Sequence, residues 1–407
     1  MPNKKKTFRE QDFPPKPEVP LAHNRVPEDA TKSNYRFRTH SENIERAKKN
    51  QTRFIERKNA VEITCEQYED RLDGGKISTD ELQNLIAEIY GKNGPNIETF
   101  TMIPQVGTVF IKTPSDWKPE HLLEFPSPLE FPSPYMIGRL DQQIPRLGRR
   151  QLARAFMHLI NSGFKHQPCA RDAHRDLNPA IHLGTWGRYS LFARLTGETD
   201  MNKQTPEAMA AVLNLCAMVG KWIVPKVRAW VKVFMPELAV RFLREIQEYI
   251  SVNIVQIDQY SAQLELNMGG VFMAFAVKIG GSHIWHKDWH DHPDYPAFVI
   301  PVENDTPEND DDLEDSDGKW TLLDDEGEHA WEGGDFCALQ PHMRIPVRPG
   351  QILIAFTRRL VHCATPEQGD RLVFTCFMDR VVLNNALDWI RDGKPARKSA
   401  EAYERKH

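Results

Sequence analysis

The chain has 407 residues, of which 40% are hydrophobic and 27% charged, so it can bury a large core and hold more than one domain. Its most apolar region, 208–234, is interrupted by charged residues and by Pro225, and the N-terminus lacks the apolar core of a signal peptide. We therefore expect no membrane association. The six cysteines include no CxxC pair, which disfavours a disulfide framework or structural zinc site and indicates a reducing compartment.

Charge is distributed unevenly along the chain. Residues 1–60 hold fifteen basic side chains against eight acidic ones, and we expect a flexible basic segment there. It is either simply solvated, or it serves nuclear import or contacts nucleic acid. Residues 303–330 hold thirteen acidic side chains and one lysine, which predicts a solvated acidic insert or one that competes with DNA for a basic groove. Because this segment contributes −12 to the total of −5, the other residues carry +7, which leaves room for an anionic partner.

Residues 61–250 are predicted to form a mainly helical region that supports a sheet. Ser78, followed three residues later by Glu81, has the pattern of a capping box and starts one helix. Thr205 before Pro206 has the pattern of an N-cap with proline at the first helical position, and this helix is expected to end near residue 223. Further helices are expected at 43–72, 226–234 and 236–250, a short strand at 109–112, a loop at 165–182, and an extended segment over the duplicated Leu-Glu-Phe-Pro-Ser-Pro sequence at 123–134.

Another helix is predicted at 146–160. An outward row of arginines there is either a solvated face or a surface for phosphate groups. The helical period places apolar side chains on the inner face and three arginines on the outer face: Leu152, Phe156, Leu159 and Ile160 inside, and Arg149, Arg150 and Arg154 outside.

From residue 252 the sequence changes to short β-branched or aromatic runs separated by glycine and proline turns. Many short strands with regular turns are typical of a sandwich or jelly roll. We therefore predict an α+β fold with a β core at 251–385, followed by a polar tail at 386–407. The predicted strands are 264–267, 271–277, 297–302, 336–339, 343–345, 351–356 and 371–377.

The sequence His286-Lys-Asp288 places a histidine and a carboxylate two residues apart, so on an extended strand they point to the same side. With a second, distant histidine, His362, they would form the two-His-one-carboxylate triad. This arrangement holds Fe(II) and leaves adjacent positions open for substrate chemistry.

Other histidines nearby compete for this role. The pair His292-Pro-Asp294 has the same spacing, but it lies against the next predicted strand and contains a proline, which disfavours a central strand. His283 and His290 are further alternatives.

Motifs downstream of the H-x-D pair follow in a set order. They are Gly-Gly-Asp-Phe from Gly333, Arg-Pro-Gly-x-x-x-x-x-Phe from Arg348, Leu-x-His-x-x-x-Pro from Leu360, and Gly-x-Arg from Gly369. Together with His-x-Asp-Trp from His286, this order resembles the double-stranded β-helix core of Fe(II)/2-oxoglutarate oxygenases. It is most similar to the TET and base-J-hydroxylase group (TET/JBP), particularly its fungal members. The similarity covers about residues 255–380.

The resemblance implies that the three residues of the triad bind Fe(II) and carry the catalysis, with 2-oxoglutarate and O2 as cosubstrates. Arg371 would pair with the distal carboxylate of 2-oxoglutarate, for which its planar fork is suited. The family often has serine two residues after this arginine. This chain has Val373 there, and Thr375, on the same strand face, is the candidate substitute.

The resemblance further implies a dioxygenase that hydroxylates the methyl group of a modified nucleobase in DNA, such as 5-methylcytosine or N6-methyladenine, after flipping the base. Trp285, Trp289 and His290 flank the ligands and could stack on the base, and Arg149 and Arg150 are candidate phosphate contacts. A DNA partner and a nuclear location follow, with a cytoplasmic location as the alternative. Two other functions stay open: the same chemistry on a protein side chain or small molecule, and a non-catalytic nucleic-acid-binding module. The sequence does not indicate an oligomeric state.

Overall fold

The computed structural model divides into two units, residues 1–46 and 47–407, and the fold described here is that of the second. Helix α1 (His40–Arg57) crosses the boundary. The predicted basic segment up to residue 39, the duplicated sequence at 123–134, the strand at 264–267 and the insert at 304–330 lie outside the described residues. The structure describes residues 40–73, 77–112, 135–166, 180–187, 194–200, 203–235, 243–253, 268, 270–303, 331–369 and 371–392.

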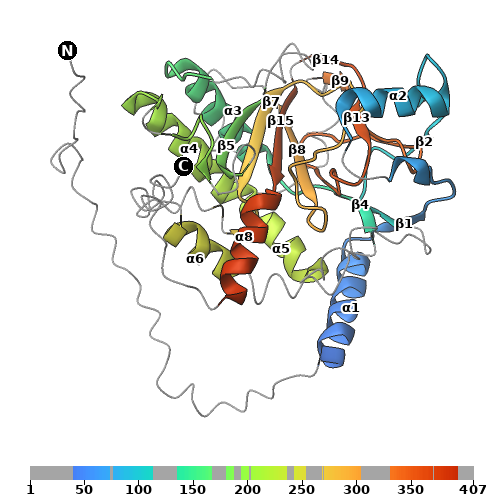
Figure 1. Cartoon of the computed structure of the whole chain (residues 1–407), viewed down its shortest axis with the longest axis horizontal. Coiled ribbons are helices and arrows are strands. Elements are labelled where there is room, and N and C mark those ends of the chain that lie inside the picture. Colours follow the sequence, from blue (N-terminus) through green and yellow to red (C-terminus); the bar gives the residue numbers. More distant parts are fainter. Residues whose placement is uncertain are drawn as a thin grey trace. The chain divides into compact units, whose positions relative to one another are not determined.

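Nine strands among these residues form one large sheet, in the order β1-β3-β4-β12-β8-β15-β7-β5-β6 (Figure 1). Its neighbours pair antiparallel except β1 and β3, which are parallel. The strands are β1 (Val61–Thr64), β3 (Val109–Lys112), β4 (Tyr135–Leu140), β5 (Ile181–Trp186), β6 (Arg194–Leu195), β7 (Ala274–Ile279), β8 (Ala297–Glu303), β12 (Ile352–Ala355) and β15 (Arg371–Phe377).

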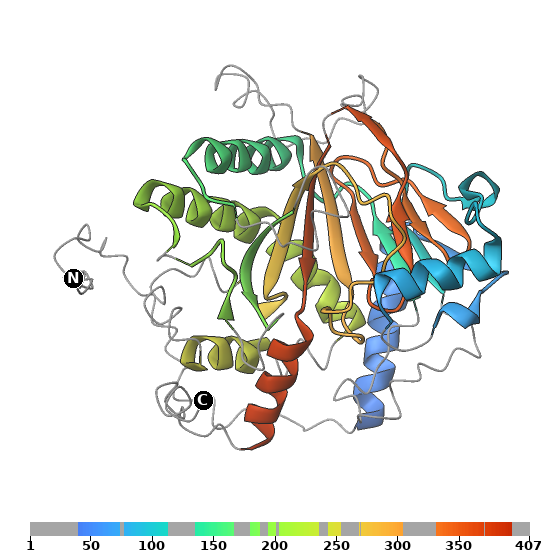
Figure 2. The same ribbon diagram turned by 45° about the horizontal axis from the view of Figure 1, so that its top comes forward.

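A small sheet of four strands has the order β13-β10-β11-β2, and two further strands, β9 and β14, pair with each other. Figure 2 shows α3 and α4 on one side of the large sheet, and the small sheet with α2 on the other. The strands are β2 (Thr101–Met102), β9 (Trp331–Gly333), β10 (Phe336–Ala338), β11 (Met343–Ile345), β13 (His362–Ala364) and β14 (Glu367–Gly369).

The two faces of the large sheet bury different sets of side chains. On β15, Leu372, Phe374 and Cys376 join the apolar core formed with the helices. Because side chains alternate along a strand, Arg371 and Thr375 lie on the opposite face, toward the small sheet. The helices are α2 (Thr79–Tyr90), α3 (Arg146–Asn161), α4 (Pro206–Trp222), α5 (Val224–Phe234), α6 (Leu243–Asn253) and α8 (Arg380–Arg391).

Local signals explain where several helices begin and how they pack. Ser78 and Glu81 form the expected capping box of α2, and Thr205 caps α4 with Pro206 in the first turn, so both predicted starts are confirmed. Gly148 lets α3 approach α4 closely, because a Cβ there would lie 2.8 Å from the Trp222 ring. None of the described helices is by itself long and apolar enough to cross a bilayer, and only α4 and α5 together meet that test, as a pair bent by 45°.

The N-terminal half contributes more strand than the sequence suggests. The helix predicted at 43–72 is wrong beyond Arg57: the chain turns at Asn59, which has a positive φ of 46°, and then forms β1. Residues 61–250 contain helices α2 to α5 and most of α6, but they also supply β1, β3, β4, β5 and β6 to the large sheet. Similarly, the loop predicted at 165–182 ends in β5, which begins at Ile181.

Two further expectations are corrected at helices. Ile160 was expected inside and Arg149 outside, but Ile160 is 44% exposed whereas Arg149 is buried and donates to the carbonyl oxygen of Ile144 (3.4 Å). The inward face of α3 is therefore turned toward Arg149 relative to the prediction. The polar tail predicted from residue 386 is also wrong at its start, because α8 continues to Arg391 and buries Ala386 and Trp389.

Candidate metal centre

Three side chains from two distant stretches of chain converge between the sheets. One ligand atom each of His286, Asp288 and His362 lies within 4.8 Å of the others, and across the described part of the chain this is the group of histidine and acidic side chains that could hold a metal ion. Nε2 of His286 lies 3.8 Å from Oδ1 of Asp288, and Nε2 of His362 lies 3.6 Å from Oδ2. Two imidazole nitrogens thus face the same carboxylate.

The backbone joins the two stretches directly. His286 and His362 form an antiparallel bridge, in which each backbone N–H donates to the other's carbonyl oxygen (3.0 and 2.9 Å). The backbone N–H of Asp288 donates to the carbonyl oxygen of Thr357 (3.1 Å). His362 opens β13 and pairs with Ala338 of β10, so the small sheet carries one histidine and holds the other through the bridge.

Both histidines are oriented through their second ring nitrogen. Nδ1 of His286 donates to the carbonyl oxygen of Ile284 (2.7 Å), and Nδ1 of His362 donates to that of Leu360 (2.9 Å). A carbonyl can only accept, so each Nδ1 carries the proton and each Nε2 keeps a free lone pair, as metal-ligating histidines require. Burial, with a contribution from His286, lowers the pKa of His362 to about 4, so this imidazole is neutral at physiological pH.

The competing histidines are engaged elsewhere. Nδ1 of His292 accepts from the backbone N–H of Asp294 (3.1 Å), and the Asp294 carboxylate pairs with Arg359. His283 donates through Nδ1 to the carbonyl oxygen of Ala364 (3.3 Å) and is 45% exposed. The structure therefore brings His286 and Asp288, rather than the second H-x-D pair, next to His362.

The turn at residues 357–359, for which the sequence predicts no role, holds the loop that follows the H-x-D pair. Thr357 donates from its hydroxyl to the carboxylate of Asp291 (2.9 Å), and Arg358 donates to the carbonyl oxygen of Trp289. With the Arg359–Asp294 ion pair, residues 357–359 contact the loop from 288 to 294 at four points. These residues precede His362 closely, but nothing local in their sequence shows the contacts.

Arg371 lies near Ala364, at the end of β13 away from His362. A Cβ built on Gly281 would lie 2.7 Å from Cβ of Ala364 and 3.4 Å from Nη1 of Arg371, so the guanidinium lies beside Ala364, two residues after His362 on β13. Arg371 is 4% exposed, and its Nε has no hydrogen-bond partner among the described residues. Burial lowers its pKa to about 10, so the group stays charged at neutral pH.

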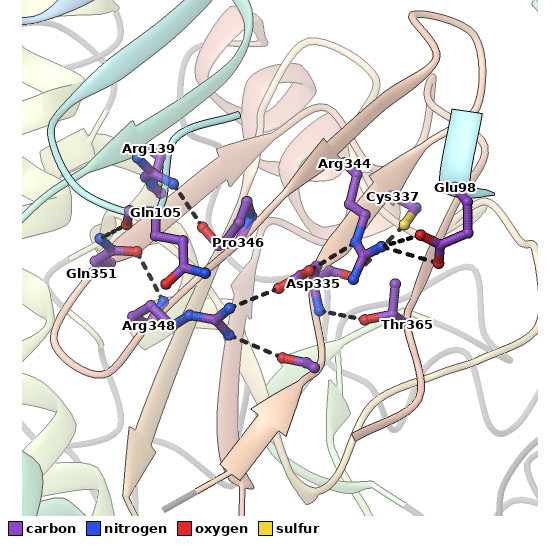
Figure 3. Close-up of polar contacts among 11 residues, drawn as sticks. Glu98, Gln105, Arg139, Asp335, Cys337, Arg344, Pro346, Arg348, Gln351 and Thr365 are labelled. Carbon is purple, nitrogen blue, oxygen red and sulfur yellow. Dashed lines mark hydrogen bonds and ion pairs between the residues drawn. The ribbon is translucent and has the colours of Figure 1, made fainter. Parts of the chain in front are cut away.

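The glycine motif before β10 makes room for this arginine. Gly334 has a φ of 66°, and a Cβ there would lie 2.9 Å from Cδ of Arg371. The next residue, Asp335, is bound by two other arginines, as Figure 3 shows: Nε of Arg344 at 2.8 Å and Nη2 of Arg348 at 3.3 Å. Asp335 is thus committed to Arg344 and Arg348. The acidic group that acts most strongly on the Arg371 guanidinium is Glu367, and Nε of Arg371 has no hydrogen-bond partner among the described residues.

Thr375 and Arg371 share a strand face but are not neighbours. They are four positions apart, or roughly 13 Å along an extended strand. Val373, which lies between them on that face, is 8% exposed and offers no hydrogen bond. The structure therefore gives no contact between Thr375 and Arg371.

The predicted substrate contacts are scattered. Trp285 is buried in an apolar cluster, with its ring 6.1 Å from that of Phe100, so it is not available to stack on a base. Trp289 is half-buried, with Nζ of Lys287 at 5.3 Å from its ring centroid, and His290 is also half-buried.

The two arginines named as phosphate contacts behave differently. The inward position of Arg149 removes it from the surface of α3, because a Cβ on Gly350 would lie 2.8 Å from its Nη1. Arg150 is half-buried on α3. Neither arginine meets the metal group in any contact that the structure describes.

Fold and site together define a mixed α+β protein with a candidate His-Asp-His metal centre between its sheets. No family model matches the sequence, and no curated protein matches it either. Among solved structures, the chain is similar to one described as NgTET1 in complex with 5mC DNA. The similarity has a TM-score of 0.42 and 10% sequence identity, and it covers 87% of this chain and 100% of the other.

Proposed function

We propose that this chain is an Fe(II)/2-oxoglutarate-dependent dioxygenase. The observation that carries the proposal is the pairing of two features. One is a His-Asp-His group whose imidazoles both present Nε2, and the other is a buried arginine near Ala364, two residues after His362, whose Nε has no hydrogen-bond partner among the described residues. Two nitrogens and one carboxylate suit Fe(II) and leave coordination positions open.

Strand order supports a double-stranded β-helix. Along the chain, β7 lies in the large sheet, the His286 bridge joins the small sheet, and β8 returns to the large one. The chain then passes through β10 and β11 (small), β12 (large), β13 (small) and β15 (large). Such alternation winds one chain back and forth between two sheets, and the metal group lies on the inner side.

The residues present fit the metal and the cosubstrate. His286, Asp288 and His362 would hold Fe(II), and Arg371 would bind the distal carboxylate of 2-oxoglutarate through its fork. When bound, iron with 2-oxoglutarate and O2 supplies oxidative hydroxylation of a C–H bond. The chain's own part is to orient the imidazoles through Ile284 and Leu360 and to keep Arg371 dry and charged.

For the substrate, we propose the methyl group of a modified base in DNA, such as 5-methylcytosine or N6-methyladenine. Two features support it: the order of the motifs, which resembles the TET/JBP group, and the charge of +7 outside the acidic segment. A nuclear location belongs to the same proposal. Hydroxylation of a protein side chain or small molecule would use the same centre, and a non-catalytic nucleic-acid-binding module would not need it.

The test uses full-length protein with Fe(II), 2-oxoglutarate and methylated oligonucleotides, and follows succinate together with the masses of the bases. Succinate with an oxidised base is the expected result. Succinate without a base product would contradict the DNA substrate while keeping the dioxygenase. Loss of succinate in His362→Ala is the matched control for the centre. Oligonucleotide binding that weakens steeply with salt is also expected.

A further inference from the structure

A buried glutamine fixes the chain around the carbonyl that orients His362. Gln340 is 0% exposed, and its side-chain Nε2 donates to the carbonyl oxygen of Arg359 (2.8 Å). Its Oε1 accepts from the backbone N–H of Val361 (2.8 Å). These two peptide groups flank Leu360, whose carbonyl oxygen accepts from Nδ1 of His362. Gln340 thus fixes the orientation of the Leu360 carbonyl, which in turn orients the imidazole ring of His362.

A second glutamine has a similar but less direct relation to His286. Nε2 of Gln83, on α2, donates to the carbonyl oxygen of Trp285 (2.7 Å). Trp285 lies between His286 and Ile284, and the carbonyl oxygen of Ile284 accepts from Nδ1 of His286 (2.7 Å). Each histidine therefore has its backbone acceptor next to a peptide group held by a glutamine amide.

Gln83 belongs to one frame, formed by residues 68–73 and 77–90, and Gln340 contacts it. Nε2 of Gln340 also lies 3.3 Å from Oδ1 of Asp73, and the backbone N–H of Glu69 donates to the carbonyl oxygen of Gln340 (2.9 Å). Lys287, the residue between the two ligands of the H-x-D pair, donates from Nζ to the carbonyl oxygen of Leu72 (2.5 Å). The segment before and including α2 thus contacts both ligand-bearing stretches.

We propose that Gln340 and Gln83 are positioning residues for the metal centre, and that residues 68–73 and 77–90 form the frame that sets the relative orientation of the two histidines. This inference rests on the proposed function, because it assumes that the group binds a metal. It adds to that function a role for the N-terminal part of the chain, which the motifs of the β core do not include. Since outer partners of metal ligands tune affinity, loss of either amide acts on the metal rather than on the fold alone.

The experiment titrates full-length protein, stripped of metal, with Co(II) and follows the visible absorption bands of the bound ion. The variants are Gln340→Met and Gln83→Met, with Gln351→Met as the matched control. Gln351 is equally buried at 3% exposure, and its Nε2 donates to Gln105 and Asp141 (both 2.9 Å), away from the metal group. We expect Co(II) affinity to fall by about 10-fold in the first two variants, the lower end of the range for direct partners of metal ligands, with displaced bands, and to stay within about twofold in the control.

Three outcomes overturn the inference. Folded Gln340→Met and Gln83→Met proteins that bind Co(II) like the unmodified chain would remove the positioning role. A loss just as large in Gln351→Met would show a general effect of destabilisation. If the unmodified chain binds Co(II) no better than His362→Ala does, the proposed metal centre itself fails. Should Gln340→Met not fold, the Gln83→Met variant alone tests the inference, because Gln83 is only half-buried on α2.

Discussion

Replacing Arg371 with methionine should raise stability and lower cofactor affinity at once. Burial lowers the pKa of this arginine from 12.5 to about 10, so keeping it charged in the folded protein at pH 7 costs roughly 3 kcal/mol. Methionine fills similar space without that cost. The variant without cofactor should therefore be more stable by up to about 3 kcal/mol, less the attraction that Glu367 loses, at about 1–2 °C in Tm for each kcal/mol in a chain of this length.

Whereas the stability should rise, the affinity for 2-oxoglutarate should fall. Arg371→Met removes two charge-assisted hydrogen bonds worth about 1.5–3 kcal/mol each, so the affinity should fall by about 100-fold or more. Thermal unfolding without ligand measures the first effect, and calorimetric titration of the Mn(II)-loaded protein with 2-oxoglutarate measures the second. Arg344→Met is the control: it removes a partner of the buried Asp335 and should destabilise the fold instead. An Arg371→Met protein that is less stable and binds 2-oxoglutarate normally would refute the reasoning.

Three other substitutions test the centre and its surroundings. Asp288→Asn should abolish Co(II) binding in equilibrium dialysis, while His292→Asn should leave it intact; equal losses would reopen the choice of ligand pair. Burial lowers the pKa of His292 to about 4, so the unfolded chain takes up a proton that the folded chain does not. The free energy of unfolding therefore keeps its full value above pH 6.5 and decreases as the pH falls toward 4. Urea unfolding across this range should show about 3 kcal/mol less acid loss in His292→Asn than in the unmodified chain. Gly334→Ala should cost about 1–3 kcal/mol and weaken 2-oxoglutarate binding, because of its positive φ and its contact with Arg371. Gly94→Ala, at a φ of 68° with nothing within 4 Å, should show the strain alone in the same assays.

Elements with strong local signals were predictable from the sequence. The strands at 343–345 and 371–377 and the capped start of α2 are where the sequence places them, since turn residues and alternation decide them locally. Strand β1 was missed because only its pairing with β3, almost fifty residues on, makes it a strand. The orientation of Arg149 was missed because its acceptor, Ile144, lies outside the helix that the period describes.

The residues of the candidate site also differ in whether the sequence predicts them. The H-x-D pair and His362 are visible in the sequence because their residue types and order are distinctive, and the structure brings them together. The residues that hold these ligands in place have no distinctive type. The backbone carbonyl of Thr357 accepts from the N–H of Asp288, and the side chain of Gln340 accepts from the N–H of Val361, just before His362. A glutamine or threonine in such a place has no pattern of its own, since its role depends on atoms brought close only by the fold.

The backbone bridge between His286 and His362 has a consequence for stability in the cell. The metal ligands come from stretches 74 residues apart, so a bound ion would act as a cross-link that exists only in the folded chain. Ligands that bind only the folded state stabilise it by mass action, by about 2.7 kcal/mol at a free concentration of one hundred times Kd. Under the proposed function this ion is iron, so chains made under iron shortage would unfold and be degraded sooner, and the amount of protein would fall together with the proposed activity.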